Sequence, residues 1–192
     1  NRRMDEIAVT PRAMPSTRYQ GSKRKVLPRL QAIFERLNFD TVLDAFGGTG
    51  AVTHLLRNMG KAVCYNDILQ SNCVIAAALF ADHPVLLDDA AVDMLFERRS
   101  DHRYHDYITG LYRGIYYTDA ENEQLDVVVQ NIHRLPLEAG RNEAFYVLFQ
   151  AMLSKRPYNL FHRANLGMRT SDVRRSFGNK TTWDRSFAIH MK

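Results

Sequence analysis

Cysteine is scarce in this chain: its 192 residues include only Cys64 and Cys73. Two cysteines cannot form a disulfide framework, so the fold must rest on an ordinary hydrophobic core. We expect Cys64 in a strand and Cys73 in the following helix, as small buried residues rather than as metal ligands or a nucleophile. The sequence also lacks a His/Cys cluster at metal-ligand spacing, and we interpret the His102 and His105 region as a solvated loop.

Long apolar runs are missing as well. None approaches the ~18 residues that a membrane-spanning helix needs, and the polar N-terminus contains no signal-peptide core. Hydrophobic residues still make up 45% of the chain, which is ordinary for a globular core. We therefore expect a cytoplasmic protein without a membrane partner, built as one domain or one domain plus a small lobe.

Charge is unevenly distributed along the chain. Residues 1–36 carry nine Lys and Arg against three acids, residues 37–154 carry eight against sixteen, and residues 155–192 carry nine against two. The last segment has a net charge of +7, which would attract a phosphate backbone. A basic segment can also be no more than solvated surface.

A glycine-rich turn is the most informative feature present. The sequence Leu43–Val52 reads LDAFGGTGAV; it follows an apolar run and opens a helical pattern. Asp67 follows seventeen positions after Gly50, beyond a second apolar run. Glycines allow close backbone approach, the helix start attracts polar ligand atoms, and a carboxylate after the second strand can accept hydrogen bonds from ribose hydroxyls. This layout predicts a nucleotide-type cofactor site; the alternative is a turn that serves packing alone.

The details of the turn distinguish between cofactors. The dinucleotide pattern G-x-G-x-x-G fails at its third glycine, where Thr53 stands, and this counts against NAD. The form D-x-F-x-G-x-G, made by Asp44, Phe46, Gly48 and Gly50, resembles the first motif of S-adenosylmethionine-dependent methyltransferases.

A second motif, RYQGSKRKVL over Arg18–Leu27, lies upstream of the turn. Together with the turn and Asn66-Asp67, it resembles the Dam-like adenine-specific DNA methyltransferases, in which an aromatic-x-G-G-K box precedes the glycine turn. Ser22 replaces the usual second glycine. The resemblance implies S-adenosyl-L-methionine as cofactor, and the implied binding residues are Tyr19, Gly21, Lys23, Asp44, Phe46, Gly48, Gly50 and Asp67. Lys23 also stands in a basic run, so a solvated lysine is the alternative.

Further stretches agree with this family. The sequence Leu111–Thr118, followed by Glu121 and Asn122, has the family's aromatic–aromatic–Thr pattern, and residues 161–183 resemble its substrate-recognition region. The resemblance implies double-stranded DNA as partner and restriction-modification as setting. The candidate DNA-binding residues are Arg163, Arg169, Arg174, Arg175, Lys180 and Trp183. Trp183 could stack on an unpaired base, although a lone Trp is more often a core residue.

One departure concerns the chemistry. The family's catalytic D-P-P-[YFW] motif is absent, since no two prolines are adjacent. In the family this motif follows the recognition region, and the chain stops in Ser186–His190, which we interpret as an unfinished strand. We therefore expect a fragment or a truncated gene product that is inactive alone, with no catalytic residue assigned, and completed by a second chain or by a part beyond Lys192.

The expected fold class is α/β, with a Rossmann-like methyltransferase core that is incomplete at its C-terminus. We predict a loose arm over residues 1–17, the cofactor-binding half over 18–84, a helical insertion over 85–155 and a basic recognition segment over 156–192. The expected function is methyl transfer from S-adenosylmethionine to the exocyclic amine of adenine in DNA. Two alternatives remain: a non-catalytic DNA-binding or assembly protein, and a methyltransferase that acts on RNA or a small molecule.

Overall fold

The computed structural model describes residues 14–15, 23–156, 164–171 and 180–192. The chain divides into two compact units, with the boundary between Pro84 and Val85, where the sequence predicts the helical insertion to begin. The predicted insertion and the described part of the basic segment pack within the same second unit. The predicted N-terminal arm lies almost wholly outside the described residues.

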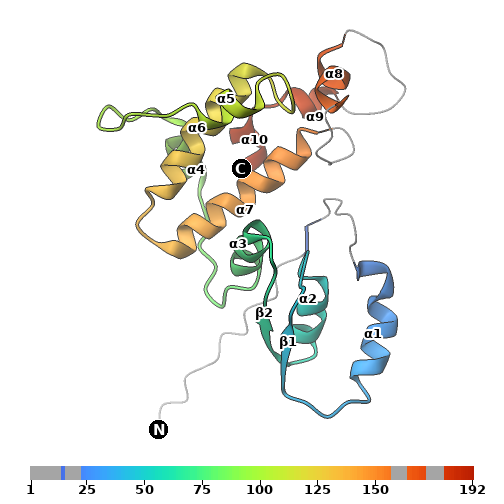
Figure 1. Cartoon of the computed structure of the whole chain (residues 1–192). Helices are drawn as coiled ribbons and strands as arrows, with labels where there is room; N and C mark the ends of the chain where they lie inside the picture. Colours follow the sequence, from blue (N-terminus) through green and yellow to red (C-terminus); the bar gives the residue numbers. More distant parts are fainter. Residues whose placement is uncertain (1–13, 16–22, 157–163, 172–179) are drawn as a thin grey trace. The chain divides into compact units, whose positions relative to one another are not determined.

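The first unit is a parallel β-α-β arrangement preceded by a helix (Figure 1). It contains a 3-10 helix at Lys23–Val26, α1 at Leu27–Phe34, β1 at Thr41–Asp44, α2 at Ala51–Asn58, β2 at Ala62–Tyr65 and α3 at Gln70–Leu79. In the sheet register Thr41 lies opposite Ala62, and Asp44 lies opposite Tyr65. The carboxyl ends of both strands therefore share one edge, where ligands bind in open α/β sheets.

Local sequence explains these elements. Pro28 lies in the first turn of α1, where its missing N–H costs no hydrogen bond. Helix α2 buries Ala51, Val52 and Leu56, a spacing that places them on one face. Gly60 adopts a φ of +76° just beyond the end of α2, as a residue that terminates a helix often does.

One face of the small sheet is exposed. Leu43 is 60% exposed, and Thr41, Ala62 and Cys64 beside it are exposed too. The expectation that Cys64 is buried is wrong, because strand side chains alternate and Cys64 points away from the face that carries Val63 and Tyr65. Cys73 on α3 is half-buried.

The described residues of the second unit form helices and connecting loops, without a strand. It contains α4 at Asp89–Phe96, α5 at Tyr107–Tyr112, α6 at Asp119–His133, α7 at Glu138–Ser154, α8 at Ala164–Thr170, α9 at Lys180–Asp184 and α10 at Phe187–Met191. Helix α6 begins with a capping box in which the Thr118 side chain and Glu121 satisfy each other's backbone N–H groups. Residues of α4, α6, α7 and α10 meet in one hydrophobic core.

The predicted strand over Ser186–His190 is wrong: this segment belongs to helix α10. The Ser186 hydroxyl caps the helix by accepting a hydrogen bond from the backbone N–H of Ile189. Phe187 and Met191, one helical turn apart, are both buried in the core. An apolar run this short fits either a strand or a buried helix, and packing decides between them.

Candidate functional site

The glycine turn between β1 and α2 forms the centre of the candidate site. Gly48 and Gly50 have φ angles of +54° and +72°, in the left-handed region that side chains disfavour. A Cβ atom on Gly50 would lie 2.7 Å from the ring of Phe80, whereas one on Gly48 would meet open space. Gly50 therefore serves the packing of α2, and Gly48 leaves room above the turn.

Tyr65, the last residue of β2, holds the turn from one side. Its hydroxyl donates a hydrogen bond to the backbone carbonyl of Gly48 at 2.6 Å. Its ring lies so close to Gly47 that a Cβ atom there would be 2.0 Å from the ring. Tyr65 fixes the path of the turn, and Gly47 makes that close approach possible.

The Asp67 carboxylate closes the site from the second strand. One oxygen, Oδ2, accepts a hydrogen bond from the backbone N–H of Gly48 at 2.8 Å. The other, Oδ1, accepts from the Leu69 N–H at 2.9 Å and from the Asn72 amide at 3.1 Å. The hydrogen bonds from the Leu69 and Gly48 N–H groups, in that order of effect, hold the pKa of Asp67 below its usual value. Asp67 is therefore a carboxylate at neutral pH.

Lys23 reaches the same turn from the 3-10 helix that precedes α1. Its ammonium donates a hydrogen bond to the backbone carbonyl of Phe46 at 2.9 Å. Its charge also helps to lower the pKa of Asp67. The structure thus brings together Lys23, the glycine turn and Asp67, three features that lie 44 residues apart at their extremes.

Asp44 lies at the end of β1, directly before the turn, and is buried. Its carboxylate accepts a hydrogen bond from the Thr53 hydroxyl of α2 at 2.7 Å. This contact ties the strand to the first turn of the helix, so in this structure Asp44 supports the turn from beneath.

The site retains binding capacity. A carboxylate can accept about four hydrogen bonds, and Asp67 accepts three from the described residues. Phe46 and Ile68 are 78% and 92% exposed at the two strand ends. One acceptor position, an ammonium group and two apolar side chains suit a ligand with hydroxyl donors, a negative group and a flat apolar part. S-adenosylmethionine has all three.

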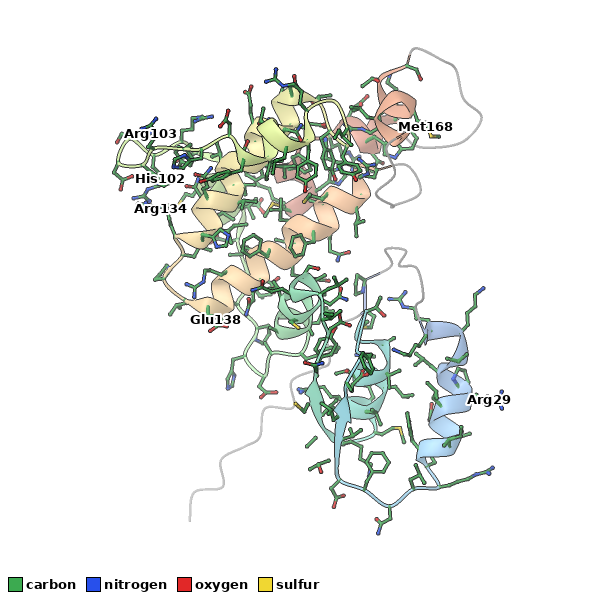
Figure 2. All side chains as sticks on the ribbon, viewed as in Figure 1. Arg29, His102, Arg103, Arg134, Glu138 and Met168 are labelled. Carbon is green, nitrogen blue, oxygen red and sulfur yellow. The ribbon has the colours of Figure 1, made fainter. Side chains whose placement is uncertain are left out.

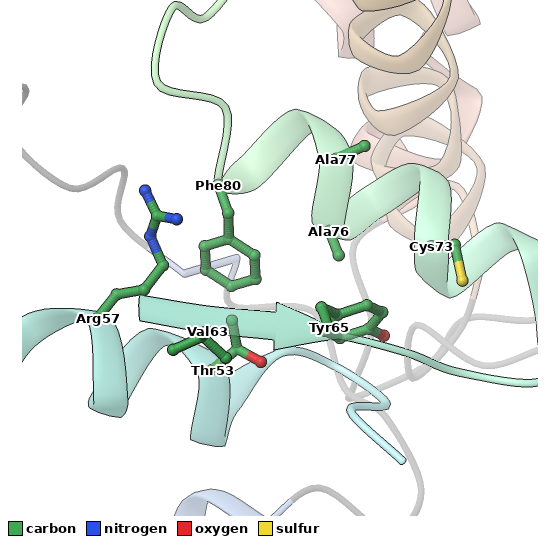
Figure 3. A pocket seen from close by; sticks show the side chains of 8 residues that line it. All are labelled: Thr53, Arg57, Val63, Tyr65, Cys73, Ala76, Ala77 and Phe80. Atoms are coloured by element: carbon green, nitrogen blue, oxygen red, sulfur yellow. The ribbon is translucent and has the colours of Figure 1, made fainter. Parts of the chain in front are cut away.

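A hollow of about 290 Å³ lies beside this site, between α2, β2 and α3 (Figure 3). Its wall includes Thr53, Tyr65 and Phe80, which support the turn, but not Lys23 or Asp67. We therefore place the candidate ligand at the turn itself.

The predicted DNA-binding residues occupy different environments. Lys180 is exposed. Arg169 and Trp183 are only 5% and 8% exposed, so neither side chain lies on the surface of the second unit. Five predicted residues lie outside the described residues: the DNA-binding candidates Arg163, Arg174 and Arg175, and the cofactor candidates Tyr19 and Gly21.

Arg169 belongs to a buried ion cluster. Both of its terminal nitrogens donate to Glu121, at 2.6 and 3.0 Å, and the Lys155 ammonium lies 2.9 Å from the same carboxylate. Lys155 and Arg169 also donate to the backbone carbonyl of Trp183. The cluster connects α6, α7, α8 and α9. Contact with DNA by Arg169 and Trp183 stays a prediction.

The sequence analysis did not single out Tyr65, Thr53 or Asn72 as parts of the site. Tyr65 resembles any aromatic strand residue, and the contact between Thr53 and Asp44 joins a helix to a strand nine positions earlier. The one available signal was the position of Tyr65 two residues before Asp67, at the end of the same strand. Within the described ranges, no three His, Cys, Asp or Glu side chains gather as a metal site, and no helix is long and apolar enough to cross a bilayer.

Comparisons with known proteins identify the family. The family model for D12 class N6 adenine-specific DNA methyltransferases matches residues 19–182. The type II methyltransferase M2.HphI of Haemophilus parahaemolyticus is 30% identical over 149 residues, which are 77% of this chain and 43% of that relative. The chain thus spans less than half the length of this relative, and no solved structure matches it. The resemblance seen in the sequence is confirmed: the chain belongs to the D12 class of N6 adenine-specific DNA methyltransferases.

Proposed function

We propose that this chain binds S-adenosylmethionine at the glycine turn, as the cofactor-binding part of an adenine-specific DNA methyltransferase with a Rossmann-like core. The observation that carries the proposal is the convergence of Lys23, the turn and Asp67 at the carboxyl edge of a parallel sheet. Such an edge is where α/β folds bind nucleotide-like ligands.

Each of these residues would contact a different part of the cofactor. Asp67 would accept a hydrogen bond from a ribose hydroxyl through its remaining acceptor position. Lys23 would pair with the carboxylate of the methionine part, while Gly48 lets that part approach the backbone. Phe46 and Ile68 would cover the adenine ring. When bound, the cofactor supplies an electrophilic methyl group.

The methyl acceptor would be the exocyclic amine of adenine in DNA, in keeping with the family. A base within a duplex must leave the stack to reach a cofactor held in a protein. The enzyme would work in the cytoplasm on double-stranded DNA and could belong to a restriction-modification system, as type II methyltransferases do. Among the described candidates for DNA contact, Lys180 is exposed, and Arg169 and Trp183 would hold its segment in place.

The rival function is a non-catalytic DNA-binding or assembly protein that retains the cofactor half. The absence of adjacent prolines, and with it of the D-P-P motif, favours this rival for the 192 residues taken alone. The intact Lys23 and Asp67 favour cofactor binding. The two functions therefore differ in methyl transfer rather than in affinity for the cofactor.

Cofactor affinity is the direct test. We expect Asp67→Ala to weaken S-adenosylmethionine binding by about 1–3 kcal/mol, because a charge-assisted hydrogen bond is lost and the turn loses its bond to Gly48. Isothermal titration calorimetry would measure the change. Asp82→Ala is the matched control, since Asp82 is an exposed carboxylate of the same unit, paired with Arg57.

Lysine variants make the test sharper. Lys23→Ala should weaken binding, whereas Lys25→Ala, which removes the same charge two positions away, should not. Equal losses from both would show that only the overall charge of the basic run matters. Unchanged affinity in Asp67→Ala, with the fold intact, would rule out the proposed site.

A further inference from the structure

The loop between α4 and α5, residues 97–106, is attached to α6 by side chains rather than by an apolar core. The Asn131 amide nitrogen donates to the backbone carbonyls of Leu95 and Glu97, both at 2.9 Å. Its oxygen accepts a hydrogen bond from the Tyr104 hydroxyl at 2.6 Å. Asn131 is buried, so this one residue holds both the start of the loop and its later part.

The far end of the loop is held in the same way. The Gln130 side chain exchanges two hydrogen bonds with the backbone of His105, at 3.1 and 2.8 Å. The buried Asp126 carboxylate accepts from the backbone N–H groups of Ile108 and Thr109 and from the Thr109 hydroxyl. Ordering a loop costs about 1–2 kcal/mol per residue in backbone entropy. These contacts meet that cost during folding, so the loop is preorganised for a partner.

The loop presents arginines to solvent. Arg98, Arg99 and Arg103 are exposed, and Arg134 lies beside them at the end of α6. Figure 2 shows Arg103, His102 and Arg134 gathered at this end of the second unit. We call residues 97–106 with Arg134 the arginine loop.

The arginines of the loop differ in how many partners they already have within the protein. Arg99 and Arg134 share the Asp101 carboxylate, at 3.1 and 3.4 Å. The Arg98 guanidinium lies 5.3 Å from the centre of the Tyr104 ring. Arg103 forms no hydrogen bond or ion pair with the described residues, so its guanidinium has all five donors available.

The acids of the loop indicate what kind of partner it fits. The loop contains three acids beside its arginines: Glu97, Asp101 and Asp106. It is therefore not a uniformly basic surface, which would only attract phosphates. Arginine pairs with the O6 and N7 edge of guanine, and a carboxylate accepts from the N4 amine of cytosine. A preorganised loop that carries side chains of both signs suits the edges of base pairs in a groove.

We propose that the arginine loop is a DNA-contacting surface that reads base edges, separate from the basic segment over 156–192. The inference rests on the proposed function, since it takes duplex DNA as the partner. Arg103 is the residue that reaches the DNA most directly, and Asn131 is the positioning residue that holds the loop in shape.

The experiment uses the full chain and a pool of duplexes of random sequence, from which the preferred duplexes are selected and sequenced. We expect Arg103→Ala to bind the preferred duplex about 5- to 150-fold more weakly, the range of one bidentate contact, and to relax the preference at one position. Arg36→Ala removes an equal charge from an exposed position in the first unit and is the matched control.

A second variant separates loop shape from charge. Asn131→Leu keeps every arginine but removes the bonds to Leu95, Glu97 and Tyr104. It should weaken binding of the preferred duplex and speed hydrogen exchange in residues 97–106, while the fluorescence of Trp183, the single tryptophan, shows that the unit stays folded.

The outcomes distinguish the two proposals. If the parent chain binds no duplex, the DNA partner of the proposed function is wrong, and the loop proposal falls with it. If the parent binds and selects a sequence, but Arg103→Ala behaves like Arg36→Ala, the loop proposal alone is overturned. Arg103→Ala could instead flatten the slope of log affinity against log salt concentration by about 0.9 and leave the sequence preference unchanged. That result would show that Arg103 contacts a phosphate and does not read a base.

Discussion

At the scale of single residues, the two glycines that flank α2 have similar positive φ angles for different reasons. Gly50 and Gly60 have φ angles of +72° and +76°, but only at Gly50 would a Cβ atom collide with a neighbour, the Phe80 ring. We expect Gly60→Ala to cost about 1 kcal/mol from backbone strain. Gly50→Ala should cost about 1–3 kcal/mol more, because the ring must move.

Hydrogen exchange of the α2 amides would compare the two glycine variants within one unit. The difference between them isolates the collision, since the strain is common to both. Equal losses would show that Phe80 shifts freely and that Gly50 is required only for its φ angle.

Glu121 is the carboxylate that pairs with the two buried cations Lys155 and Arg169. Burial raises the pKa of its carboxyl, but hydrogen bonds from Arg169 and Lys155 outweigh burial and bring the pKa down to about 2. Because this lies below the unfolded value of 4.5, its contribution to stability is fully present above pH 4.5 and is lost as the pH falls toward 2.

We therefore expect Glu121→Gln to lower the free energy of unfolding of the second unit at neutral pH by about 3 kcal/mol, since buried cations lose their partner. In this variant the free energy of unfolding should also depend much less on pH between 4.5 and 2. Urea unfolding followed by Trp183 fluorescence would measure both effects. Glu123→Gln, an exposed change on the same helix, should leave stability and pH dependence as they are.

At the scale of elements, the sequence predicted what local signals specify. Both strands and the helix between them follow from the two apolar runs and the glycine turn, and all are present. Lys23 and Asp67 were predictable because motif spacing places them beside the glycine turn. Helix α10 was mistaken for a strand because five residues carry too little periodicity, and only the buried positions of Phe187 and Met191 distinguish the two.

Contacts between distant elements were beyond local reasoning. Arg169 looked like a surface cation in a basic segment, but its partner Glu121 lies 48 residues earlier, at the N-terminus of another helix. Trp183 is buried by the same packing. A net charge counted along the sequence thus overestimates the charge that a segment presents, since part of it is neutralised within the fold.

At the scale of the whole molecule, we infer that cofactor binding is separable from group transfer. All described cofactor candidates belong to the first unit and lie in or beside the glycine turn, where Lys23 donates to the carbonyl of Phe46 and Asp67 accepts from the N–H of Gly48. Transfer to adenine additionally needs groups that hold the target amine against the methyl group. The printed sequence has no D-P-P motif to do this.

We expect the 192-residue polypeptide to bind S-adenosylmethionine and to transfer no methyl group to DNA on its own. A misplacement of about 1 Å at a reacting centre already costs roughly 100-fold in rate, so a missing acceptor motif should leave no measurable turnover. Tritium transfer from labelled cofactor to duplex DNA would be measured beside calorimetric binding, with an active adenine methyltransferase as positive control. Binding without transfer supports a cofactor-binding part; robust transfer would mean that these residues include acceptor groups of another kind, and the exposed side chains around Phe46 and Ile68 would be the first to test.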